Sequence, residues 1–218
     1  MDKKELKRLI RAEFDSSLKE LGYLKKGETA YIKLFENIIR NITFELGSTG
    51  FTCWVAMQPL YVKEYTPSVY LHLSFGKRLS RFRVVKREWW PYDDATRGIL
   101  EIKELLEKNG LPWFDQYGTP EGIVKFISHG KVDQYGIWLD RFDQQQYLGF
   151  SLLYLGRTNY GVRVLKRMLK GIGKDSADFI KDYRTQINQL IERIEEHPED
   201  VKKILDDIVQ ENRAALKI

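Results

Sequence analysis

Residues 38–57, IIRNITFELGSTGFTCWVAM, contain the pattern that decides the fold class. Two runs rich in β-branched and aromatic residues, Ile38–Leu46 and Phe51–Met57, are separated only by the glycine-flanked turn Gly47–Gly50. Two such runs across a short turn are typical of a β-hairpin. We therefore expect this hairpin to form the centre of an antiparallel sheet.

Similar runs flank the hairpin. Thr29–Phe35 precedes it and Val69–Phe75 follows it, so the pattern predicts a meander of antiparallel strands. A further strand is expected through Arg81–Val85, which gives a sheet of four to five strands. The apolar residues of segment 3–21 recur at helical spacing, and Gly22 follows as a helix stop. The fold class is therefore α+β, with the sheet packed on an N-terminal helix.

The chain after Pro91 reads as helical. A helix is predicted from Asp93 or Asp94 to Gly110, followed by the aromatic linker Leu111–Phe114. Thr119, Pro120 and Glu121 form a helix start, with a capping hydroxyl, a proline in the first turn and an early acid.

The pattern in the last third of the chain predicts a C-terminal helical hairpin array. Helices are expected over Tyr147–Leu155 and Tyr160–Leu169, then from Asp175 to the His197-Pro198 turn, and finally from Val201 onward. A degenerate tetratricopeptide repeat is the alternative, although no 34-residue period recurs. We expect an α+β domain over residues 1–135 and an all-helical region over residues 136–218.

The net charge of +5 is concentrated in one place. Gly76–Trp90 holds six basic residues against the single acid Glu88, whereas the chain from Phe142 onward has 13 basic and 12 acidic residues. Three interpretations stay open: a sheet edge guarded by charge, a surface for an acidic protein partner, or a nucleic-acid contact. Because Trp and Arg dominate binding hot spots, the predicted partner-binding residues are Lys77, Arg78, Arg81, Arg83, Lys86, Arg87, Trp89 and Trp90.

Motifs that carry catalysis are missing from the sequence. The three histidines, His72, His129 and His197, have no second His or Cys at ligand spacing, and neither a nucleophile-elbow nor a phosphate-loop motif occurs. We therefore predict a non-enzymatic protein with no catalytic residues, no metal and no cofactor. The alternative is an enzyme whose site is assembled from dispersed residues, with His72, Asp115 and the arginines as candidates.

The single cysteine, Cys53, excludes an internal disulfide and lies in an apolar run, so we expect it to be buried. The charged start, Met1 to Arg8, lacks a following apolar segment, and no uncharged run is long enough to cross a membrane. These features predict a cytoplasmic protein with no membrane segment.

Two short motifs resemble those of a known family. The first is Leu21-Gly22-Tyr23-Leu24-Lys25-Lys26-Gly27, which precedes a predicted strand. The second is Leu111-Pro112-Trp113-Phe114, which precedes the helix start Thr119-Pro120-Glu121. Together they resemble the bacterial domain-of-unknown-function 4304 family over residues 3–130. That family has no established activity, so the resemblance implies no catalytic residues. Relatives of this group resemble immunity proteins, and the expected function is therefore a protein-binding module for an acidic partner such as a toxin.

Overall fold

The computed structural model describes residues 1–63, 75–82, 88–132, 139, 141–172 and 178–218. The chain folds into two compact units. The sheet unit comprises Met1–Gln58 and His72–Gly118 together with Val132–Trp138, and the helical unit comprises Pro59–Leu71, Thr119–Lys131 and Leu139–Ile218. This division differs from the single boundary near residue 135 that the sequence suggested, because two segments from the first 131 residues belong to the helical unit.

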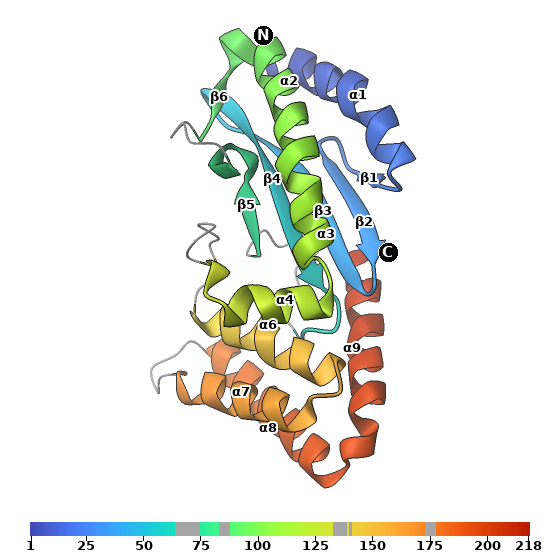
Figure 1. Cartoon of the computed structure of the whole chain (residues 1–218), viewed down its shortest axis with the longest axis vertical. Helices are drawn as coiled ribbons and strands as arrows, with labels where there is room; N and C mark the ends of the chain where they lie inside the picture. Colours follow the sequence, from blue (N-terminus) through green and yellow to red (C-terminus); the bar gives the residue numbers. More distant parts are fainter. Residues whose placement is uncertain (64–74, 83–87, 133–138, 140, 173–177) are drawn as a thin grey trace. The chain divides into compact units, whose positions relative to one another are not determined.

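The sheet unit confirms the α+β expectation. Its antiparallel sheet follows the order β1-β2-β3-β4-β5, and β6 also pairs with β4 (Figure 1). Residues Glu36 and Asn37, both with positive φ, form the tight turn between β2 and β3. The strands are β1 (Leu24–Lys26), β2 (Ala30–Phe35), β3 (Ile38–Leu46), β4 (Gly50–Pro59), β5 (Gly76–Arg78) and β6 (Trp90–Pro91).

Helix α1 (Lys3–Glu20) packs its apolar side on the sheet. Asp2 and Glu5 form a reciprocal capping box, in which each side chain accepts a hydrogen bond from the other residue's backbone N–H (2.8 and 3.0 Å). The helix buries Leu6, Ile10, Phe14 and Leu18. The ring of Phe14 meets that of Phe44 on β3 edge to face, at 4.9 Å between centroids.

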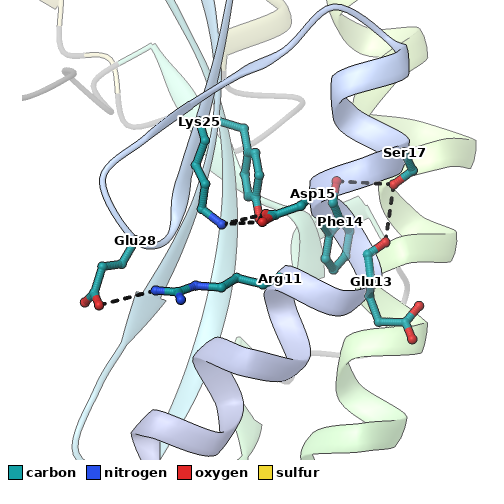
Figure 2. A network of polar contacts seen from close by, with 8 residues as sticks. Arg11, Glu13, Phe14, Asp15, Ser17, Lys25 and Glu28 are labelled. Atoms are coloured by element: carbon teal, nitrogen blue, oxygen red, sulfur yellow. Dashed lines mark hydrogen bonds and ion pairs between the residues drawn. The ribbon is translucent and has the colours of Figure 1, made fainter.

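The outer edge of α1 is joined to β1 and β2 by polar contacts. Figure 2 shows Lys25 donating to both oxygens of Asp15 at 2.6 and 2.7 Å, and the Tyr31 hydroxyl donates to the same carboxylate at 2.6 Å. Burial alone would raise the pKa of the Asp15 carboxyl, but the hydrogen bonds from Lys25 and Tyr31 outweigh it and hold the pKa below its ordinary value. Asp15 therefore stabilises the helix-to-strand contact in its ionised form.

Helices α2 (Ala95–Leu105) and α3 (Leu111–Tyr117) run over the sheet as one nearly continuous rod (Figure 1). A π-helical turn, Leu106–Gly110, joins them, so the predicted stop at Gly110 and the predicted linker Leu111–Phe114 are both wrong. Gly110 has a helical φ of −67°. A Cβ there would come within 3.0 Å of Leu79 and 3.2 Å of Val55, so this glycine permits close packing instead of ending the helix.

Two expected strands have different outcomes. Leu79–Phe82 forms a 3-10 helix, so the predicted strand through Arg81–Val85 is wrong at its first two residues, and 83–85 lie outside the described residues. The run Val69–Phe75 lies outside them as well, except for Phe75. Phe75 is fully buried and contacts Trp113 edge to face.

The helical unit contains α4 (Pro120–Ser128), α6 (Arg141–Tyr154), α7 (Thr158–Lys170), α8 (Asp178–Glu196) and α9 (Val201–Leu216). The predicted start of α4 is confirmed, because Thr119 Oγ1 accepts a hydrogen bond from Gly122 N at 3.0 Å and Pro120 opens the helix. Helices α6 and α7 pack through Gly149 and Gly161. A Cβ on Gly161 would lie 2.9 Å from the Gly149 carbonyl oxygen, so the two helices approach closely only because both residues are glycine.

Residues 60–63, directly after β4, are held by side chains from the helices of the same unit. Gln146, which is buried, donates to the Lys63 carbonyl at 2.6 Å and to the Tyr183 hydroxyl at 2.8 Å. Asn212 Nδ2 donates to two further carbonyl oxygens of this segment, at 2.7 and 2.9 Å. The segment has no regular structure, so these amides satisfy backbone groups that a strand or helix would otherwise pair.

Candidate functional site

The predicted basic segment contributes an arginine to the second face of the sheet. Arg78 ends β5 and pairs in register with Trp54 of β4. Its guanidinium carbon lies 4.8 Å from the ring centroid of Trp54 and 5.0 Å from that of Trp89. Only 11% of the Arg78 side chain is exposed. The two indoles thus hold this arginine in place by cation–π contact.

Glu88 neutralises two of the predicted cations. Its carboxylate forms ion pairs with Arg78 and with Arg81, the latter at 2.5 Å, and Arg78 also lies 3.8 Å from Glu45. Burial opposes ionisation of Glu88, but the hydrogen bonds and charges of Arg81 and Arg78 outweigh it and keep the pKa of this carboxyl below its ordinary value. Arg78 and Arg81 therefore already have an acidic partner within the protein.

Of the other predicted partner-binding residues, some are buried and the rest lie outside the described residues. Lys77 is 3% exposed, with its ammonium 4.0 Å from the Phe82 ring centroid, and burial together with the charge of Arg81 lowers its pKa to about 8. Trp90 is buried, and its indole N–H donates to Glu101 at 2.8 Å. Neither side chain is accessible to a partner. Arg83, Lys86 and Arg87 lie outside the described residues.

Only part of the dispersed enzyme site considered in the sequence analysis lies within the described residues. His72 is outside the described residues, and Asp115 pairs with Arg40 at 2.8 Å while its own side chain is 76% exposed. Arg40 is buried and lies over the Phe35 ring, at 4.4 Å from the centroid. No group of three His, Cys, Asp or Glu side chains suited to a metal ion occurs in the described ranges.

A second cationic surface, which the sequence analysis missed, lies on α7 in the helical unit. The α7 groove has a volume of about 760 Å³ and is formed by α7, the end of α8 and Pro198. Four cations line it at positions i, i+3, i+4 and i+7 of one helix, so they share a face about 10 Å long. The residues lining the α7 groove are Thr158, Asn159, Val162, Arg163, Lys166, Arg167, Lys170, Ile194, Glu195 and Pro198.

The cations of the α7 groove are exposed and mostly without acidic partners. Lys166 donates to both oxygens of Glu195, at 2.6 and 2.8 Å. Arg163 lies over the exposed Tyr160 ring at 5.5 Å. Arg167 and Lys170 form no ion pair with any acid of the described chain. Among the described residues that line the groove, Glu195 is the only acid, so the groove carries a net positive charge.

A local charge count would have found this surface. Between Gln144 and Lys174 the sequence has six basic residues and no acid, a larger excess than that of Gly76–Trp90. The near balance of the whole C-terminal third concealed it, because the acids are concentrated from Asp175 onward. Counting charge by helix instead of by region separates a cationic α7 from α8, in which acids outnumber bases.

Of the two cationic segments, the α7 groove is the one whose described cations are exposed and suited to binding anions. No family model, curated protein or solved structure matches this chain. Within the described residues, no helix has the length and apolar character needed to cross a membrane.

Proposed function

We propose that this protein is a non-enzymatic binding module that holds an acidic protein partner in the α7 groove. The observation that carries the proposal is the row of four exposed cations on one face of α7, with Glu195 as the only acid described beside them. A concentrated positive field of this kind attracts carboxylates and speeds association with an acidic surface.

The α7 groove supports this role better than the segment first predicted. Arg78 and Arg81 are already paired with Glu88, so an acidic partner would have to displace an internal carboxylate from both. Arg167 and Lys170 need no such exchange. The exposed Pro198 adds apolar surface to the groove, which gives a partner a contact beyond charge alone.

The resemblance of residues 3–130 to the bacterial domain-of-unknown-function 4304 family adds a biological setting to the proposal. An immunity-protein-like role would have the module cap an acidic toxin in the bacterial cytoplasm. In this form of the proposal the partner's acidic residues dock on α7, and no chemical reaction takes place.

The test uses a fluorescein-labelled hexaglutamate peptide as the acidic probe and fluorescence anisotropy at low ionic strength. Charge reversal of Arg163 and Arg167 to Glu should weaken binding by about tenfold or more, since each lost contact also becomes a repulsion. The matched control reverses Arg184 and Lys203, two exposed cations of the helical unit that do not line the groove.

Equal effects of the two double variants would overturn the proposal, because binding would then depend only on net charge. A duplex oligonucleotide should bind more weakly than the peptide. If it binds more tightly, with the steep salt dependence of phosphate neutralisation, the ligand is nucleic acid and the proposal is wrong.

A further inference from the structure

Glu195 occupies the α7 groove as a carboxylate supplied by the protein itself. It lies in the last turn of α8, one residue from the end of that helix, and both of its oxygens accept from Lys166 Nζ. This is the contact that a carboxylate of an acidic partner would make with the same lysine. Glu195 therefore occupies the position on Lys166 that a carboxylate of the proposed ligand would take.

The ion pair between Lys166 and Glu195 is exposed enough for an external carboxylate to replace Glu195. The side chains of Lys166 and Glu195 are each 49% exposed, so water reaches both partners and the pair contributes little to stability. Glu195 has no other hydrogen bond or ion pair in the described part of the protein. Releasing it costs one exposed contact and leaves its carboxylate in water, where it is well solvated.

The remaining cations determine what can displace it. Arg163, Arg167 and Lys170 lie on the same face of α7 and have no carboxylate partner among the described residues. A ligand with several adjacent carboxylates can bind these three first, which holds its next carboxylate close to Lys166 at a high effective concentration. A ligand with a single carboxylate lacks this advantage and can reach Lys166 only by competing with Glu195 directly.

We infer that Glu195 is an internal competitor that sets the affinity of the α7 groove and selects ligands with clustered carboxylates. This inference rests on the proposed function. It adds that Lys166 is exchanged between an internal and an external carboxylate, and that removing the internal one strengthens binding without any new contact to the ligand.

The experiment compares Glu195→Gln with Glu192→Gln, which makes the same charge change on the same exposed side of α8 but outside the groove lining. Hexaglutamate should bind Glu195→Gln about fivefold more tightly than the wild-type protein, which is the factor expected for the loss of one exposed competing pair. Glu192→Gln should change the affinity by less than about twofold, through the general field alone.

A double-mutant cycle identifies the mechanism. In the Lys166→Gln background, Glu195→Gln should give no more gain than Glu192→Gln, because the contested cation is gone. Equal gains for the two single variants, or a full gain without Lys166, would show that Glu195 does not compete, while the proposed function stands. A wild-type protein whose binding is insensitive to Arg163 and Arg167 reversal would instead refute the proposed function itself.

Discussion

Arg78 and Trp54 lie opposite each other on strands β5 and β4, with the guanidinium carbon 4.8 Å from the indole centroid. Together with Trp89 and Glu88, this pair fixes the short edge strand of the sheet unit to the strand beside it. The arginine that looked like a binding residue in the sequence is thus part of the structure of the sheet.

The first prediction concerns the different roles of two neighbouring arginines. Arg78→Met should lower the free energy of unfolding of the sheet unit by about 2 kcal/mol, because it removes a desolvated cation–π contact and leaves Glu88 with one partner. Arg81→Met should cost less than about 1 kcal/mol, since 33% of that side chain is exposed. Urea unfolding followed by tryptophan fluorescence measures both, and equal losses would contradict the assignment.

The second prediction concerns alkaline pH. Burial and the charge of Arg81 lower the pKa of Lys77 to about 8, from an ordinary value of 10.5. Between these values the unfolded chain holds more protons than the folded chain, so stability should rise with pH across this window. The free energy of unfolding of the wild type, relative to that of Lys77→Met, should therefore increase from pH 8 to pH 10.5. Parallel curves for the two proteins would refute this.

The third prediction concerns acid pH. The pKa of Asp15 is lowered in the folded protein, so its contribution is fully present above the ordinary value of 3.8 and is lost as pH falls through the lowered value. Asp15→Asn should destabilise the sheet unit at neutral pH and reduce its loss of stability on acidification. Acid titrations followed by tryptophan fluorescence test this. Asp93→Asn, which removes an exposed carboxylate elsewhere in the sheet unit, is the control.

The fourth prediction concerns the packing of α6 on α7. Replacing a helical glycine by alanine ordinarily stabilises a helix by about 1 kcal/mol. Gly161→Ala should instead lower the free energy of unfolding by about 1–3 kcal/mol, because its Cβ would lie 2.8 Å from Leu153 and 2.9 Å from the Gly149 carbonyl oxygen. Chemical denaturation followed by circular dichroism gives the sign directly, and a stabilised variant would show that the helices can separate.

The sequence predicted correctly those elements whose ends are determined by local turn and capping residues. The turn at Gly47–Gly50, the start of α4 at Thr119 and the end of α1 before Gly22 all depend on residues adjacent in sequence. Gly110 misled the prediction because its role depends on Leu79 and Val55, which are distant in the chain. The sequence alone does not distinguish a glycine that ends a helix from a glycine that allows another element to pack closely against the helix.

The binding surface was harder to predict for a related reason. Six basic residues in Gly76–Trp90 stand out in the sequence, but pairing with Glu88 and burial of Lys77 depend on how the segment folds. The cations of α7 stand out less, because the excess of acidic residues from Asp175 onward balances them in a regional count. Which charges are paired is a property of the tertiary structure, and only one of the four groove cations has an acidic partner among the described residues.

The anchoring of residues 60–63 by Gln146, Tyr183 and Asn212 has a consequence for the order in which the protein folds during synthesis. During translation this segment leaves the ribosome long before α9, which supplies one of its hydrogen-bond donors, has been synthesised. The helical unit can therefore be completed only after α9 has been synthesised, and the two carbonyl groups that Asn212 binds lack this donor until then. Cutting the gene between the two units would give fragments that each lack part of their own fold.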